Sequence, residues 1–488
     1  MDQKIGLFAW LLAGFAVLIG ISVYVLKGGL FNYARALALL LPFVFILLIN
    51  VRSHWHVLIL AFVTAESIVI PVYGLNKLTI EMLLLSAVAF TLVLDYIIKK
   101  PVREHPFYYA DRLVFCLGII FAVRFLYDRP GFVGLGMETG GLVNSIYYTI
   151  APWFYFAVRA VFARARLTRQ QLWAVLFVSA ITNVAMLHFA PSLEYTFWGR
   201  KVVNAPAWLF CATALALVIS LRPGLKKWFL FYSISFGMLG LGLISNYRSR
   251  TLFFAAEILL IAYFAKIFKQ AVIVLIIGGV LGTGAMYVAG GGRLPRVVNR
   301  AISIFMDVEK TDYTAGGAYG WEDTFRRELY QIAWGRIREN PIVGSGFGLN
   351  VQEALQMLST FRTVTYAELV AHSGNYHNSV LEIAVRVGLP AAVIFSIFYV
   401  VYFLRFFKTI ESLEGVDKTW AIAITAFWAA NTGMMLMNGG PKEYFVSMVI
   451  CGIMAGLTAR TLKNSTAPAE APRAVATPPA NVGISLSV

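Results

Sequence analysis

His377 and Asn378 stand where a long polar segment meets an apolar stretch, and the sequence there reads HNSVLEIAVRVG. An ionisable side chain at the mouth of a membrane-spanning helix is expensive to desolvate, so it is a candidate for function. An imidazole titrates near neutral pH and can serve as a general base. The alternative is a helix-terminal histidine that only hydrogen-bonds loop backbone. Asn378 is equally suited to capping the helix or to orienting the imidazole.

The elements that must position these residues are membrane helices. Of the 488 residues 59% are hydrophobic and only 14% are charged, and the mean hydropathy is +0.72. A soluble protein of this length needs more polar surface than this composition supplies. Apolar runs of roughly 17 to 25 residues recur along most of the chain, and each can cross a bilayer core of about 30 Å. The composition predicts an all-α polytopic membrane protein with about 12–14 transmembrane helices.

The charges and cysteines argue against several other classes. The net charge is +16, but the Lys and Arg residues lie in short loops between apolar runs, which is typical of topology signals rather than of a nucleic-acid-binding surface. Cys116, Cys211 and Cys451 fall inside apolar runs and lack the spacing of metal ligands. We therefore expect no nucleic-acid partner, no metal and no cofactor.

The apolar runs divide the chain into four parts. These are a transmembrane bundle of about eleven spans (residues 1–290), one large extracytoplasmic loop with short helices (291–376), three further spans (377–462) and a disordered cytoplasmic tail (463–488). The predicted spans begin near Ile5, Tyr33, Trp55, Leu78, Arg112, Val143, Gln171, Ala205, Lys227, Arg250, Gln270, Asn378, Lys418 and Lys442.

Basic residues favour alternate short loops, for example the loop with Lys99, Lys100 and Arg103. Because Lys and Arg are enriched in cytoplasmic loops, this bias predicts that both ends of the chain are cytoplasmic. The large loop then lies outside the cytoplasm, and so do Arg248 and Arg250. Arginines on the side that is usually poor in them need another reason to be there.

The large loop contains an amphipathic helix, predicted from Asp323 to Glu339, with Asp323 or Thr324 as its N-cap. Asn340-Pro341 ends it. Its apolar stripe consists of Phe325, Leu329, Ile332 and Ala333. The alternative for this basic helix is that it simply lies on an anionic lipid surface.

Three other features of the loop region are weak signals. GSGFG at 344–348 lacks the Lys-Ser/Thr pair of a phosphate-binding loop, so we expect a tight turn. His372 and His377 are five residues apart without an acidic or cysteine partner at ligand spacing. Glu382 and Arg386 have i, i+4 spacing and are expected to satisfy each other.

Three blocks within residues 245–393 resemble the O-antigen ligase and O-antigen polymerase superfamily of bacterial membrane glycosyltransferases. The block SNYRSRTLFFA is similar to the family's Ser-Arg pair at the start of a helix and has Arg250 in the arginine position. The block RRELYQIAWGRIRENPIVGSGFG is similar to the family's loop segment and has Arg326 in its arginine position.

The third block resembles the ligase pattern, with His377 and Asn378 followed after nine residues by Gly388. Ligases usually have Gly, Thr or Tyr three residues after that glycine, where this chain has Ala391. The predicted number of spans also exceeds the twelve that are usual for ligases. Both departures favour a polymerase over a ligase.

The resemblance implies glycan transfer from an undecaprenyl-diphosphate-linked saccharide to an acceptor sugar hydroxyl, with inversion and without metal. It implies His377 as the general base, Arg250 and Arg326 on the diphosphate and Arg248 as an auxiliary. Asn378 and Glu257 are auxiliary candidates. Glu257 either tunes the site, seven residues after Arg250, or pairs with another span.

The resemblance leaves several functions and partners open. A polymerase joins repeat units, whereas a ligase moves the glycan to lipid A-core. A transporter or flippase for lipid-linked sugars, or an assembly scaffold, would also be polytopic, but the candidate residues lie at the outer surface rather than at the midplane. The implied partners are the lipid-linked donor, the glycan or lipid A-core acceptor, the lipid bilayer and other polysaccharide-assembly proteins. The implied location is the bacterial inner membrane, with the active site facing the periplasm.

Overall fold

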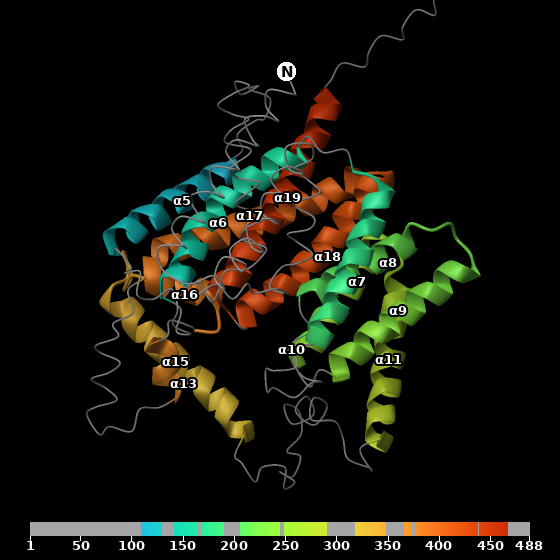
Figure 1. Cartoon of the computed structure of the whole chain (residues 1–488), viewed down its shortest axis with the longest axis horizontal. Coiled ribbons are helices and arrows are strands. Elements are labelled where there is room, and N and C mark those ends of the chain that lie inside the picture. Colours follow the sequence, from blue (N-terminus) through green and yellow to red (C-terminus); the bar gives the residue numbers. More distant parts are fainter. Residues whose placement is uncertain are drawn as a thin grey trace, which may run out of the picture.

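The computed structural model describes residues 109–128, 141–163, 167–189, 205–244, 248–289, 318–347, 366–372, 376–437 and 439–466. Within these ranges all regular structure is α-helix, which confirms the predicted all-α class (Figure 1). The predicted spans that begin near Ile5, Tyr33, Trp55 and Leu78 lie outside the described residues. The predicted tail began at residue 463, but residues 463–466 still belong to the last helix. The rest of the tail lies outside the described residues.

Seven helices precede the large loop in the described part of the chain, and each begins within three residues of a predicted span start. They are α5 (Tyr109–Asp128), α6 (Gly141–Phe162), α7 (Arg169–Phe189), α8 (Ala205–Ile219), α9 (Leu225–Ile244), α10 (Arg248–Phe264) and α11 (Phe268–Ala289). The agreement has a local cause, because each helix begins where a polar connection gives way to a long apolar run.

Four described helices follow the large loop, and one of them lies at the centre of the bundle. They are α16 (Ser379–Val387), α17 (Leu389–Ser412), α18 (Gly415–Met437) and α19 (Pro441–Thr466). In Figure 1, α18 lies between a group formed by α5, α6, α16, α17 and α19 and a group formed by α7 to α11, and it packs against members of both. Gly452 and Gly456 of α19 let the backbone of α6 approach closely, as small residues do between membrane helices.

The predicted long span from Asn378 is wrong, because the helix is broken at Gly388. This glycine has φ of +101° and separates α16 from α17. A Cβ at this position would overlap the carbonyl of Ile342, so the break is where the polar loop packs against the chain. Pro390, in the first turn of α17, fits the start of a new helix.

The helices of the large loop lie at one end of the bundle, where Figure 1 shows α13 (Ala318–Glu339) and α15 (Tyr366–His372). α13 ends at Glu339 as predicted but begins before Asp323, so the predicted N-cap at Asp323 or Thr324 is wrong. The predicted apolar stripe is confirmed, because its four residues are buried or half-buried and pack on the core.

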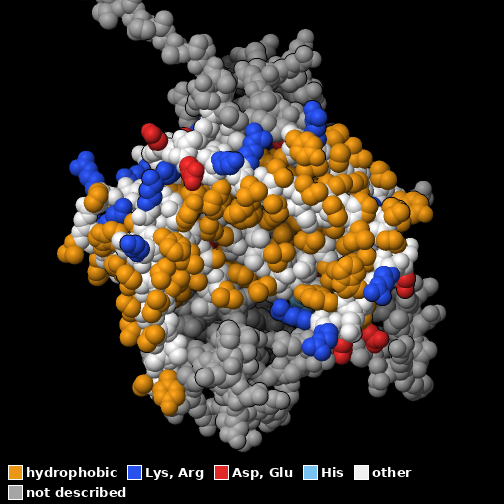
Figure 2. All heavy atoms as spheres, turned by 180° about the vertical axis from the view of Figure 1, so that it is seen from behind, with side chains coloured by type: hydrophobic (Ala, Val, Ile, Leu, Met, Phe, Trp, Pro, Cys, Tyr) orange, Lys and Arg blue, Asp and Glu red, His pale blue; other side chains and the backbone are white. Residues whose placement is uncertain are grey.

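In the part of the chain that the structure describes, three helices are long and apolar enough to cross a bilayer: α17, α18 and residues Glu443–Thr461 of α19. They correspond to the three spans predicted after the loop, with the first displaced from Asn378 to Leu389. Figure 2 shows exposed apolar side chains in a broad band across one face, with charged side chains mostly along its edges. This distribution is typical of a protein surface that contacts lipid.

Candidate active site

His377 lies where the loop meets the bundle, in an unusual backbone conformation. Its φ of +53° is in the left-handed region, which costs a non-glycine residue about 1–2 kcal/mol. Its half-buried ring makes an edge-to-face contact with Phe325 of α13, with 5.8 Å between ring centroids and 74° between planes. Strained residues of this kind persist where their neighbours fix them, and they cluster at functional sites.

Two glycines of the α18–α19 turn fix this backbone. Gly439 has φ of +60° and lies so close to His377 and Asn378 that a Cβ on it would overlap the Asn378 nitrogen. The Ser379 hydroxyl donates to the Gly440 carbonyl and accepts from the Gly440 N–H, both at 3.2 Å. The start of α16 is therefore clamped onto the turn that ends α18.

Asn378 is the N-cap of α16. Its side-chain oxygen accepts a hydrogen bond from the Leu381 N–H at 3.1 Å, and its backbone is extended. Of the two roles weighed from the sequence, capping is therefore the one that the geometry supports. A cap of this type stabilises a helix by about 1 kcal/mol.

The buried carboxylate of Glu382 anchors Tyr376, the residue before His377, through a hydrogen bond. Glu382 accepts the Tyr376 N–H at 3.0 Å and the Tyr148 hydroxyl at 2.5 Å. Because Tyr376 is joined to His377 by one peptide, this anchoring fixes how the chain approaches the left-handed turn. The sequence predicted a pair between Glu382 and Arg386 alone. In the structure two tyrosines also supply hydrogen bonds to the carboxylate.

Tyr376 also ties the loop to α13. Its hydroxyl accepts a hydrogen bond from Arg336 Nη1 at 2.7 Å, and the same nitrogen donates to the Ala371 carbonyl of α15 at 3.3 Å. Burial raises the pKa of Tyr376, while the Arg336 guanidinium acts against that rise. The phenol is therefore neutral at physiological pH.

The predicted turn at 344–348 packs against the end of α16. Gly344 and Gly346 have φ of +68° and +90°, as a tight turn requires. The Ser345 N–H donates to the Val385 carbonyl at 2.6 Å, and the Gly346 N–H donates to the Arg386 carbonyl at 2.9 Å. These amides bond to protein rather than forming a phosphate cradle.

Phe347 connects the same turn to α5 and α6. Its N–H donates to Asp128 at 2.7 Å, and the same carboxylate oxygen accepts from Arg124 at 2.9 Å. The guanidinium of the buried Arg386 lies 6.0 Å from the ring centroids of both Phe347 and Tyr148. The turn thus stabilises the end of α16, the helix that begins directly after His377 and Asn378.

Arg326 is the residue after the one that contacts His377. It is half-buried on α13, directly after Phe325, whose ring touches His377. The neighbouring Arg327 is exposed. The two arginines therefore differ in environment although they are adjacent in the chain.

Arg250 lies at the same end of the bundle as the histidine. It is half-buried in the first turn of α10, and Phe253, one turn further on, packs directly against Gly433 of α18. Gly433 precedes Gly439, which touches His377, by six residues, or roughly 9 Å along a helix. Arg248 is the first residue of α10, but its side chain lies outside the described part of the chain.

Glu257 is separate from this frame. It is fully buried in α10, and neither of its carboxyl oxygens has a hydrogen-bond partner among the described residues. The pairing with another span, which the sequence favoured, is thus not seen in the described part of the bundle. Seven residues of helix put Glu257 about 10 Å from Arg250 along α10.

An open cavity of about 780 Å³ lies between the C-terminal half of α13 and the start of α17, with α16 between it and His377 in the chain. Trp334, Ile337 and Leu389 supply apolar walls, and Arg338 supplies a cation. Trp334 is 51% exposed. The cavity therefore offers an apolar surface at the edge of the bundle with a positive charge beside it.

The arrangement can transfer a proton and stabilise an anion. His377 supplies a titratable ring, and Arg250 and Arg326 supply permanent positive charge. Within the described ranges no group of three or more His, Cys, Asp and Glu side chains is placed to hold a metal ion.

Sequence reasoning missed most of the frame around His377. Tyr376 adjoins the histidine, and Gly439-Gly440-Pro441 is a turn signal. Both could therefore have been identified from the local sequence. Tyr148 gave no such signal, because it lies 234 residues from Glu382 in the chain.

Comparison with known proteins identifies one region. The model of the O-antigen ligase family matches residues 233–396, which run from α9 into α17. This segment contains Arg250, Arg326 and His377. No curated protein matches the chain. Residues 233–396 of this chain are therefore similar to the O-antigen ligase family.

Proposed function

We propose that this protein is a surface-polysaccharide polymerase, which transfers a saccharide from an undecaprenyl-diphosphate carrier to a sugar hydroxyl on the periplasmic face of the inner membrane. The observation that carries the proposal is the fixed left-handed conformation of His377, between α13 and the α18–α19 turn and within the family match. A strained ionisable residue with this much support is typical of a catalytic group.

His377 acts as the general base. Its imidazole takes the proton of the acceptor hydroxyl while the oxygen of that hydroxyl attacks the anomeric carbon. The bond from this carbon to the diphosphate oxygen breaks, and the diphosphate leaves with the electron pair. One displacement inverts the anomeric centre. General-base catalysis of this kind contributes about 10²- to 10⁴-fold to a rate.

Arg250 and Arg326 bind the diphosphate, with Arg248 as an auxiliary. Negative charge builds on the leaving diphosphate as the glycosidic bond breaks, and planar guanidinium groups stabilise it through bidentate hydrogen bonds. Because the donor is already activated and the arginines carry the charge, neither a nucleotide nor a metal is required.

The cavity between α13 and α17 supports a lipid-linked donor. Its walls of Trp334, Ile337 and Leu389 suit a polyprenyl chain whose diphosphate end reaches Arg326 along α13. The cavity adjoins α17, which is long and apolar enough to cross a bilayer, so a lipid can reach it from the membrane.

The test is glycan transfer in liposomes that contain the purified protein and an undecaprenyl-diphosphate-linked repeat unit. Wild type is expected to give a ladder of lengthening glycans on a gel, insensitive to a metal chelator. His377→Asn and His377→Gly, which tolerate φ of +53°, are expected to lower the rate by at least about 100-fold.

The matched control is His372→Ala, which removes a histidine from the same loop at the end of α15. It should leave the rate within about twofold. Full activity in both His377 variants would overturn the assignment of the base. Loss of activity in His372→Ala as well would point to general disruption of the loop.

The second candidate function is an O-antigen ligase, which the description of the matched family favours. The same liposomes supplied with lipid A-core distinguish the two. Label that moves to lipid A-core without a ladder identifies a ligase. If neither product forms and His377→Asn still restores surface polysaccharide in cells, the protein acts in transport of the lipid-linked sugar.

A further inference from the structure

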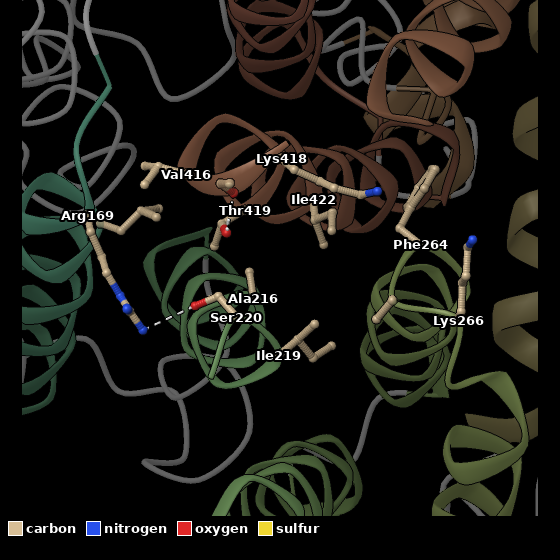
Figure 3. A pocket seen from close by; sticks show the side chains of 13 residues that line it. Arg169, Ala216, Ile219, Ser220, Phe264, Lys266, Val416, Lys418, Thr419 and Ile422 are labelled. Carbon is tan, nitrogen blue, oxygen red and sulfur yellow. Dashed lines mark hydrogen bonds between the residues drawn. The ribbon is translucent and has the colours of Figure 1, made fainter. Parts of the chain in front are cut away.

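Figure 3 shows a second cavity, of about 480 Å³. It lies at the opposite end of the bundle from His377, because α18 begins at this cavity and ends close to Gly439, which touches His377. It is formed where α7 and α18 begin and where α8 and α10 end. α10 starts near the candidate active site and ends at this cavity, so its 17 residues separate the two by about 25 Å. The cavity is therefore not part of the transfer site.

Among the described residues, three cations and no acidic side chain line this cavity. Arg169 stands on one side and Lys266 and Lys418 on the other, with the hydroxyls of Ser220 and Thr419 between them (Figure 3). Arg169 donates a hydrogen bond of 3.3 Å to the Ser220 hydroxyl. Positive charges that share one partly enclosed space repel one another, and a bound anion relieves that repulsion.

Two of the negative charges near these cations are engaged elsewhere, and Glu414, four residues before Lys418, is exposed and is not among the described lining residues. Asp417, next to Lys418 in sequence, forms an ion pair with Arg460. The partial negative charge at the end of α8 is met by Lys227, whose amine donates to the Ile219 carbonyl at 2.7 Å. Among the described residues no acidic side chain pairs with Arg169, Lys266 or Lys418.

The remaining lining is apolar. The side chains of Leu172, Ile219, Phe264 and Ile422 form it. A cavity with cations and hydroxyls on one part of its wall and alkyl and aromatic groups on the rest matches an amphiphile with an anionic head. Phosphate suits this set best, because several donors can share its oxygens.

We propose that this cavity binds a phosphate ester, through Arg169, Lys266 and Lys418. The apolar lining and the membrane setting favour the phosphate of an anionic phospholipid over that of a water-soluble metabolite. The cavity lies at the end of the bundle remote from His377. The proposal is therefore independent of the proposed transfer reaction. Bound lipid there ties the ends of α8 and α10 to the start of α18.

The test is binding to the purified full-length protein in detergent, measured by native mass spectrometry and thermal unfolding. The probes are phosphatidylglycerol, sn-glycerol 3-phosphate and diacylglycerol, which separate the lipid from the phosphate. Lys266→Gln combined with Lys418→Gln is expected to weaken phosphatidylglycerol binding about tenfold to thirtyfold. Lys266 is exposed and Lys418 half-buried, so neither change should impair folding.

The matched control is Lys226→Gln combined with Lys269→Gln, which removes the same charge from exposed positions that do not line the cavity. Binding to phosphatidylglycerol alone supports a lipid ligand. Binding to glycerol 3-phosphate of equal strength, lost in the cavity variant only, supports the phosphate site and makes its source a soluble ester. Equal loss in both double variants, or no preference for phosphatidylglycerol over diacylglycerol, overturns the proposal.

Discussion

The two ends of the helix bundle handle charge in opposite ways. At the candidate active site, charged side chains are buried and hydrogen-bonded, as when Glu382 accepts from Tyr148 and Tyr376. At the far end, cations surround an open cavity, and no acidic residue is found among the described residues of its lining. The Glu382 carboxylate therefore has its partners within the protein, whereas the cations of the far cavity have no carboxylate beside them among the described lining residues.

The functions proposed for the two ends would account for this difference. A catalytic base must already be in place when the substrate arrives, so its frame is desolvated and fixed in advance. Buried polar networks are stable only when every member is satisfied, which explains the close bonding around Glu382. A binding cavity can leave its charges partly in water, because the ligand itself supplies the missing partner.

Glycine replacement should give the largest difference in stability between the two ends. Gly388→Ala is expected to lower the free energy of unfolding by about 3 kcal/mol or more, because φ is +101° and the new Cβ overlaps the Ile342 carbonyl. Gly415, in the lining of the far cavity, has φ of +57° but no atom within 4 Å of an added Cβ. Gly415→Ala should cost only about 1 kcal/mol.

Thermal unfolding of the detergent-solubilised protein compares these two glycine variants. Equal losses in the two would mean that the contact with Ile342 contributes nothing, and that the break between α16 and α17 tolerates a side chain.

The positioning role of Glu382 should appear in the catalytic rate. Glu382→Ala leaves the Tyr376 N–H and the Tyr148 hydroxyl without their acceptor, so the turn at His377 loosens. We expect kcat for glycan transfer to fall about 100-fold while KM changes little. Lys418→Ala at the far end should leave kcat unchanged. A rise in KM at constant kcat would instead assign Glu382 to substrate binding.

The next effect concerns the shape of the cation. Arg326→Lys keeps the charge but loses the planar fork, and we expect transfer to fall about tenfold. Arg327→Lys, at the exposed neighbouring position, and Arg169→Lys, in the far cavity, should leave the transfer rate within twofold. Initial rates in liposomes measure all three. Similar losses at Arg326 and Arg327 would indicate that α13 contributes only general positive charge.

The smallest expected effect is on salt dependence. Raising the ionic strength screens repulsion between exposed cations, so the lipid-free protein should gain at most about 0.5 kcal/mol of stability between 50 and 500 mM salt. Lys266→Gln combined with Lys418→Gln should reduce that gain, whereas Glu382→Ala should not. Thermal unfolding across a salt series measures it. An unchanged salt dependence in the double lysine variant would show that the cavity cations do not repel one another appreciably.

Several features of the fold followed from the sequence because they have local causes. α5 to α11 begin within three residues of the predicted positions, since a span start is marked by a change from polar to apolar residues. The stripe of α13 and its end at Glu339 followed from helical periodicity and from Asn340-Pro341. The three arginine and histidine motifs followed from the resemblance, and the family match covers them.

Other features did not follow from the sequence. The stretch after Asn378 reads as one apolar run, so only its contact with Ile342 explains why it breaks at Gly388. The i, i+4 spacing of Glu382 and Arg386 suggested a local pair, but two tyrosines supply the hydrogen bonds to the carboxylate. From the sequence, the cations that line the far cavity were interpreted only as basic residues of short loops.

The sequence by itself determined that this is an all-helical membrane protein with a region similar to the O-antigen ligase family, and that His377, Arg250 and Arg326 are its candidates for chemistry. Hydropathy, helical period and short motifs are properties of neighbouring residues, so they can be read along the chain. Only the tertiary structure decided that His377 is held in a left-handed turn, and that cations far apart in the chain share one cavity. Those facts depend on contacts between residues up to hundreds of positions apart, which no local pattern encodes.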